Sequence, residues 1–126
     1  MSEVVSVTGD QFRGAATHEG STRFLLYLEG TADYAALDAL ETLLDRTHAE
    51  ALRLGVKEVV VDLRTVEFMN SSCFKCVLSW ITSINELEVE ARYRIALLSS
   101  AKHHWQKRSL QSLRCFAVEL ITVTES

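Results

Sequence analysis

The stretch that decides the fold is residues 59–84, VVVDLRTVEFMNSSCFKCVLSWITSI. It begins with three valines, and such a β-branched apolar run favours a buried strand. A short polar turn follows, and Ser71 and Ser72 then open a segment whose apolar residues recur at three- and four-residue steps. That spacing is typical of one face of an α-helix. The stretch therefore predicts a strand, a turn and a helix.

Ser71 and Ser72 lie where the pattern changes from strand-like to helical, so they fall at or just inside the N-terminus of the predicted helix. A serine oxygen at such a position can cap the helix by accepting a free backbone N–H, which is worth about 1 kcal/mol. The same end stabilises anions, including a phosphate on a serine, because free amides and the positive end of the helix dipole lie there. The residues alone leave both uses open.

The same stretch resembles the signature of STAS domains, the fold of bacterial anti-sigma factor antagonists. In that family a hydrophobic strand ends in Asp-Leu, and the run Phe-hydrophobic-Asp-Ser-Ser-Gly-Leu leads into a helix. Here Asp62 and Leu63 follow the valines, and Phe68, Met69, Asn70 and the two serines follow in register. The order of elements over residues 22–124 also fits.

The resemblance implies an α/β fold with a mixed, partly parallel β-sheet flanked by about three to four α-helices. The chain length predicts one domain of this kind over residues 1–126, with N-terminal strands in 3–28 and a core in 29–126. Two positions depart from the family pattern. Asn70 stands for the family's Asp and loses a negative charge, and Cys73 stands for its Gly and adds a side chain that can obstruct a partner.

Carried over from the family, Ser71 is the residue that a partner phosphorylates, with Ser72 as second choice. The partner-binding residues would be Asn70, Ser71, Ser72, Cys73 and Lys75. The partner would be both a serine kinase of the histidine-kinase-like ATPase type and an anti-sigma factor, and a serine phosphatase would reverse the modification. The chain itself would be a binding regulator without cofactor, not an enzyme. A STAS scaffold of a larger signalling complex, without phosphorylation, is the alternative within the same fold.

A hypothesis from another class rests on Cys73 and Cys76, which form a C-x-x-C pair at a predicted helix N-terminus. This location lowers a thiol pKa, as in thioredoxin-like enzymes. The chain has no proline, however, and thioredoxin folds hold a cis-proline beside the pair. The alternative without redox chemistry is that both thiols pack as small hydrophobic side chains.

The remaining elements follow from periodicity and turn residues. We expect strands at 3–8, 12–17, 23–28, 93–98 and 117–123, and helices at 34–54 and 102–113. Gly55 is expected to end the first helix, and Ser99 or Ser100 to cap the last. Trp80 lies off the main apolar stripe and is interpreted either as a partly exposed interface anchor or as packed against a neighbouring helix. The basic residues Lys102, Lys107, Arg108 and Arg114 are interpreted as a solvated face.

Composition bounds the class of protein. The chain has 126 residues, 48% hydrophobic and 24% charged, with a net charge of −4, so nothing suggests a general affinity for nucleic acid or anionic membranes. No run approaches the length of a membrane span, and the first residues lack the features of a signal peptide. Three cysteines argue for reduced thiols. We therefore expect a cytoplasmic protein; the oligomeric state, including a homo-oligomer, is left open.

Overall fold

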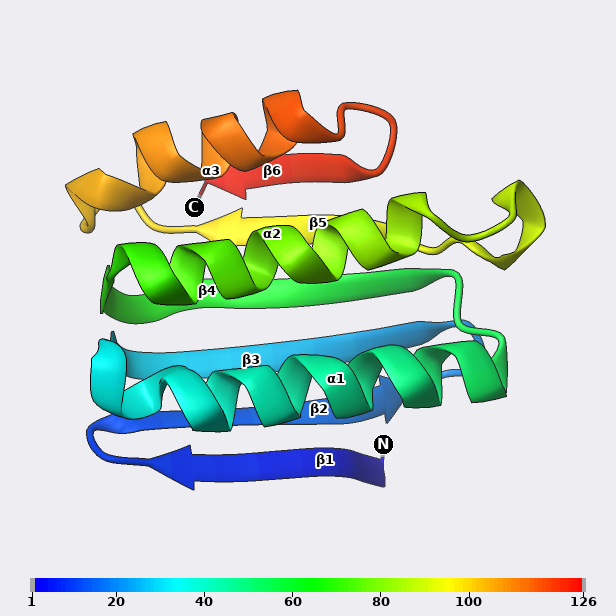
Figure 1. The fold of residues 1–126 in the computed structure, drawn as a ribbon, viewed down its shortest axis with the longest axis horizontal. Helices are drawn as coiled ribbons and strands as arrows, with labels where there is room; N and C mark the ends of the chain where they lie inside the picture. The colour runs from blue at the N-terminus through cyan, green and yellow to red at the C-terminus, as the bar shows by residue number, and fades with distance from the viewer. Residues whose placement is uncertain (1, 126) are drawn as a thin grey trace.

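The computed structural model describes residues 2–125 as a six-stranded sheet with three α-helices (Figure 1). The strands are β1 (Ser2–Gly9), β2 (Phe12–Glu19), β3 (Arg23–Ala32), β4 (Glu58–Met69), β5 (Arg94–Ser99) and β6 (Ile121–Glu125). The helices are α1 (Leu37–Leu54), α2 (Ser71–Asn85) and α3 (His104–Phe116), with short 3₁₀ helices η1 (Tyr34–Ala36) and η2 (Val89–Ala91). The α/β class with a mixed sheet is confirmed.

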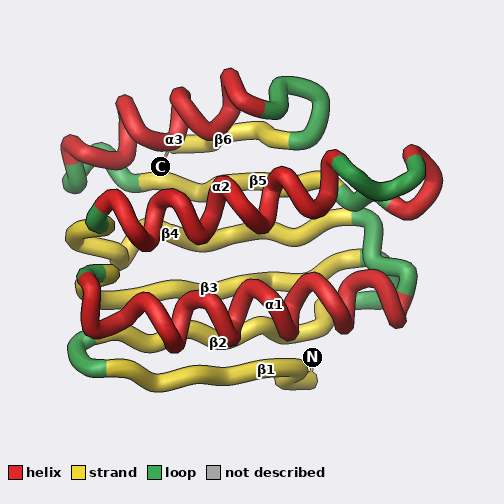
Figure 2. The backbone as a smooth tube through the Cα atoms, in the orientation of Figure 1, coloured by secondary structure: helices red, strands yellow, loops and turns green. Residues whose placement is uncertain are grey.

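The strands lie side by side in their order along the chain, from β1 to β6. The first three pair antiparallel through tight hairpins, whereas β3, β4, β5 and β6 pair parallel. Each parallel step is made through a helix, and such crossovers are right-handed, so the helices gather on one face of the sheet. Figures 1 and 2 show α1 and α2 lying across this face, with α3 beside β6.

The hydrophobic core fills the space between the helices and the sheet. In β3 the side chains of Phe24, Leu26 and Leu28 alternate inward and are almost completely buried. Burying an aliphatic or aromatic side chain of this size stabilises a fold by about 1.5–3 kcal/mol. The largest fully buried side chains are Tyr93, Phe24, Leu26, Leu28, Leu40, Leu43, Ile81, Ile84, Ile95, Leu97, Leu110 and Leu113.

The two central strands are longer than the sequence predicts. β3 continues past Gly30 to Ala32, and β4 runs to Met69 where a polar turn was expected. The two strands remain paired to their ends. Their register shifts between Tyr27 and Glu29 and again between Gly30 and Thr31, in the part where polar residues interrupt the apolar pattern. Gly30 has a φ of 102°, and a Cβ there would collide with the carbonyl of Gln11. Only glycine fits here, where the turn between β1 and β2 approaches β3 closely.

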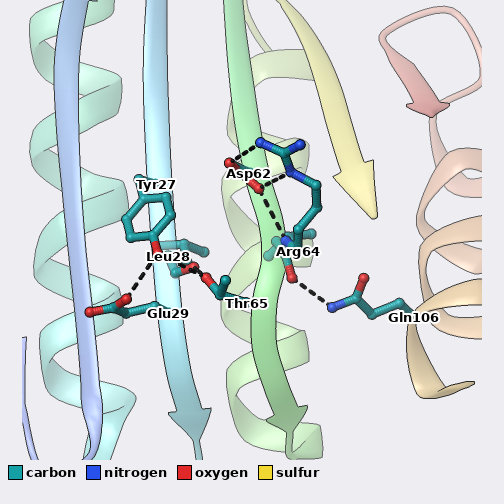
Figure 3. A network of polar contacts seen from close by, with 8 residues as sticks. Tyr27, Leu28, Glu29, Asp62, Arg64, Thr65 and Gln106 are labelled. Atoms are coloured by element: carbon teal, nitrogen blue, oxygen red, sulfur yellow. Dashed lines mark hydrogen bonds and ion pairs between the residues drawn. The ribbon is translucent and has the colours of Figure 1, made fainter. Parts of the chain in front are cut away.

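Gln106 of α3 closes the part of β4 that extends beyond β5. The pairing of β4 with β5 ends at Asp62, and the fully buried Gln106 side chain then donates to the carbonyls of Leu63 (2.6 Å) and Val66 (3.0 Å). Its Oε1 accepts the backbone N–H of Ser100 at 2.9 Å. Figure 3 shows Gln106 reaching toward β4 beside the Asp62–Arg64 ion pair. The start of α3 is thereby fixed against the sheet.

Gly55 ends α1 as predicted, with a left-handed φ of 69°. The other helix boundaries need correction. Residues 34–36 form a 3₁₀ turn before α1, and α3 starts at His104 without a side-chain cap, so neither Ser99 nor Ser100 caps it. The last strand begins at Ile121 because α3 runs to Phe116 and a tight turn follows.

Among residues 2–125, no helix has the length and apolar character needed to cross a bilayer.

Candidate functional site at the start of α2

The first turn of α2 follows directly from the end of β4, and Asn70 makes the junction. Its backbone N–H donates to the carbonyl of Ala32 in β3 at 2.9 Å. Its side-chain oxygen accepts the N–H of Cys73 at 2.9 Å, which is the geometry of an N-cap. The cap is therefore Asn70, and the expectation that one of the serines caps the helix is wrong. Asn70 has the extended backbone that a cap requires, whereas Ser71 is already helical.

Ser71 is the first residue of α2 and its side chain is exposed, whereas Ser72 is half-buried. The first turn holds no acidic residue. The backbone N–H groups at the first helical positions have no partner within a helix, and the positive end of the helix dipole adds to them. A negative group on Ser71 would thus meet a favourable field and no local carboxylate from the same turn.

The two cysteines of the C-x-x-C pair do not have the properties of a redox pair. Cys73 is fully buried, and its thiol lies 3.4 Å from the carbonyl oxygen of Asp33, to which it donates. Burial raises the pKa of the Cys73 thiol, and burial with nearby carboxylates raises the pKa of Cys76 to about 12. Reactive thiols need a lowered pKa. Cys115, by contrast, is exposed near the end of α3.

The burial of Cys73 corrects its expected place on the partner-facing surface. Its side chain faces the core and packs α2 against the segment after β3, so it presents no obstacle outside the helix. Lys75 is exposed on α2, and its part in partner binding stays a prediction.

Two exposed aromatic residues lie at the same end of the sheet as Ser71. Phe68, next to the last residue of β4, is 48% exposed, and Tyr34, two residues after β3, is 78% exposed. The ends of β3 and β4 are neighbours, because Thr31 pairs with Phe68. Large aromatic side chains of this kind are favoured anchors of protein interfaces. Phe68 was noted only as part of the signature and Tyr34 only as the start of a predicted helix, so the sequence did not indicate that either side chain is exposed.

A shallow cavity of about 330 Å³ lies between the start of α2 and α3. It is lined by Met69, Asn70, Ser71, Phe74, Arg108, Ser109 and Ser112. Arg108 makes no ion pair with any residue in the described part of the chain. Arg108 was interpreted only as part of a solvated face. The sequence did not indicate that it lies beside Ser71, because the two residues are 37 positions apart and only the fold brings them to the same cavity.

Trp80 lies away from this end and is buried, with only 5% exposure. Its indole N–H donates to the hydroxyl of Tyr93 at 2.7 Å. The interpretation of Trp80 as a partly exposed interface anchor is therefore wrong, and the packed alternative holds. Its position off the main apolar stripe of α2 directs it toward α1 and the start of β5, not toward solvent.

The fold is similar to those of solved anti-sigma factor antagonists. One from Mycobacterium paratuberculosis matches with a TM-score of 0.66 at 16% identity, covering 89% of this chain and 84% of that one. The unphosphorylated form of the anti-sigma factor antagonist SpoIIAA matches with a TM-score of 0.59 at 14% identity, covering 88% and 87%. The phosphorylated form of the Bacillus cell fate determinant SpoIIAA matches at 0.55 and 19% identity, covering 88% and 90%.

No protein-family model and no curated protein sequence matches the chain. The structural likeness, at these identities, establishes the fold. The chain thus has the STAS fold, as its sequence signature predicts, and solved anti-sigma factor antagonists share this fold.

Proposed function

We propose that this chain is a single-domain, cytoplasmic regulator that acts by binding a protein partner and is switched by phosphorylation of Ser71. The partner would be an anti-sigma factor with serine kinase activity, and a serine phosphatase would restore the binding form. The observation that carries the proposal is the exposed hydroxyl of Ser71 at the start of α2, within a fold that SpoIIAA adopts in both its unphosphorylated and phosphorylated forms.

The surroundings of Ser71 support both halves of the proposal. Exposed Tyr34 and Phe68 supply apolar area for a partner, and Lys75 adds a positive charge on the same helix. Phosphorylation adds about −1.5 to −2 charge units at pH 7, which alters a surface that must fit the partner. Arg108 lines the cavity beside Ser71 and would give the phosphate a counter-charge. Ser72 is less accessible and remains the second choice.

The family's acidic residue before the serines is Asn70 here, and its role in this structure is that of a helix cap. An Asp would cap in the same way, since either side chain offers the same acceptor oxygen. The substitution therefore preserves the position of Ser71. The loss of one negative charge beside Ser71 reduces repulsion of a phosphate at that residue.

The experiment begins with phosphopeptide mass spectrometry of the protein from its own cells, over residues 65–80. We expect a phosphate on Ser71 under some growth conditions. Full coverage of these residues with no phosphate under any condition would contradict the switch and favour the alternative, a STAS scaffold that is not phosphorylated.

Partner binding is then compared for Ser71→Ala and Ser71→Asp, with Ser79→Asp as the matched control, since Ser79 is also exposed on α2. The bound partner should have ATPase activity. It should bind Ser71→Ala and Ser79→Asp, and it should not bind Ser71→Asp. Equal binding by the two Ser71 variants would contradict the switch. Loss of binding in Tyr34→Ala and Phe68→Ala, each with an unchanged fold, would place the partner on this surface.

A further inference from the structure

Three side chains from three elements form a hydrogen-bond chain inside the molecule, toward the opposite end of α2 from Ser71. The hydroxyl of Tyr93, the residue before β5, lies 2.6 Å from Nδ1 of His48 on α1. The indole N–H of Trp80 on α2 donates to the same hydroxyl at 2.7 Å. Tyr93 is fully buried and Trp80 is 5% exposed. These contacts join α1, α2 and the start of β5 through polar atoms.

The count of protons fixes the state of His48. An indole nitrogen can only donate, so the Tyr93 oxygen accepts from Trp80. The single hydroxyl proton of Tyr93 then has one acceptor in the chain, Nδ1 of His48. This arrangement satisfies all three groups only when His48 is neutral and carries its proton on Nε2.

His48 also faces a cavity of about 240 Å³ between α1 and α2, so it is within reach of solvent protons. The charged groups of this cavity are Glu41 and Asp45, both from α1. The Asp45 carboxylate favours the imidazolium, but burial opposes it more strongly, and the pKa of His48 is lowered from its ordinary 6.5. Cys76 from α2 and Tyr93 stay neutral at physiological pH, because burial raises the pKa of each.

We propose that the chain His48–Tyr93–Trp80 is a proton-sensitive latch, closed while His48 is neutral and opened by its protonation. The imidazolium presents N–H groups at both nitrogens, so its Nδ1 can no longer accept the Tyr93 proton. The hydroxyl would then need a new acceptor in a fully buried site. Rotation of the His48 ring into the cavity, toward Asp45, separates the two opposed donors and breaks the link between α1 and Tyr93, which leaves the Tyr93 hydroxyl without its acceptor.

The latch acts on the helix that also carries Ser71, but it does not depend on phosphorylation or on a partner. It rests on contacts among His48, Trp80 and Tyr93, none of which lies in the cavity beside Ser71. A failure of the proposed switch at Ser71 would therefore leave this inference in place, and the reverse also holds.

The test is an NMR titration of the full chain between pH 8 and pH 4.5, following the ring carbon protons of His48 and the indole N–H of Trp80. We expect both signals to follow one midpoint below 6.5, with the indole of Trp105 as the internal control. A Trp80 indole signal that stays constant while His48 titrates would overturn the proposal.

Two variants establish the cause. Tyr93→Phe removes only the hydroxyl, so the midpoint of His48 should move upward and the Trp80 indole should lose its pH dependence. The matched control is Tyr27→Phe, which removes the hydroxyl of a half-buried tyrosine that contacts Glu29 and Thr65 and leaves the latch intact. His48→Gln serves if Tyr93→Phe does not fold. It offers an acceptor that does not titrate, and a Trp80 signal that still changed with the same midpoint would refute the latch.

Discussion

At the scale of single residues, Asn70 determines how Ser71 is presented. Its side chain holds the first turn of α2 while its backbone N–H is anchored on the end of β3. Ser71 is therefore a helical residue with a free hydroxyl, whose oxygen is not occupied by capping. A residue that a kinase must reach has to be accessible and held in a fixed position. Asn70 provides both for Ser71.

We predict that Asn70→Ala lowers the free energy of unfolding by about 1 kcal/mol, because the N–H of Cys73 loses its acceptor. Asn70→Asp should keep the wild-type value or exceed it slightly, since a carboxylate caps equally well and favours the helix dipole. Urea denaturation followed by circular dichroism measures both.

The matched control for Asn70→Ala is Asn85→Ala, at the exposed last position of the same helix. That change should stay within about 0.5 kcal/mol of the wild type. Equal effects at the two asparagines would mean that the cap makes no specific contribution.

At the scale of elements, the junction of α3 with β4 depends on one side chain. The Gln106 side chain is fully buried, donates to two carbonyls of β4 and accepts the N–H of Ser100. The junction fixes the start of α3, the helix on which Arg108 lies beside the candidate site.

Gln106→Ala should destabilise the fold by about 3 kcal/mol, because three backbone groups lose their partner in a buried site. The loss of helix anchoring should also raise amide exchange in the first turns of α3. Gln111→Ala, at an exposed position of the same helix, is the control and should change stability by less than about 0.5 kcal/mol. A similar result for the two variants would contradict the role assigned to Gln106.

The sequence predicts the elements better than their ends. The apolar periodicity of α1 reflects burial of one face of the helix, and the valine run of β4 reflects burial within the sheet. The order of strands and helices can therefore be predicted from the sequence. The continuation of β3 through Gly30 and of β4 through polar residues depends on pairing between the two strands, which local sequence does not encode. A motif in the sequence predicts Ser71 and Lys75 as site residues, whereas only the tertiary fold brings Arg108 and Tyr34 near Ser71.

At the scale of the whole molecule, buried titratable groups set the pH range of stability. The pKa of Asp62 is lowered from 3.8, chiefly by its hydrogen bond with Arg64, and that of His48 is lowered from 6.5 by burial. Each contributes stability that is present above its unfolded value and is lost as the pH falls. Cys76 and Tyr93 have raised pKa values, so their contributions are present below 9.0 and 10.0 and are lost above them.

We therefore predict a plateau of stability between about pH 6.5 and pH 9, with a decline on either side. Calorimetric melting temperatures across pH 4 to 11 check it. His48→Gln should remove the part of the acid decline that begins below 6.5 while leaving the part near the titration of Asp62. A melting temperature that rose as the pH fell from 7 to 5 would contradict the assigned signs.

The positions of the three thiols give the molecule a built-in attachment point for a reporter. Cys73 and Cys76 keep their protons at neutral pH because burial raises their pKa, whereas Cys115 is exposed. Cys115 lies near the end of α3, and α3 and α2 both start at the same end of the sheet, where α2 begins with Ser71 (Figure 1). A maleimide fluorophore should therefore label the native protein at one site, far from the proposed partner surface. The anisotropy of that dye would report partner capture and release in real time, with no change to the sequence.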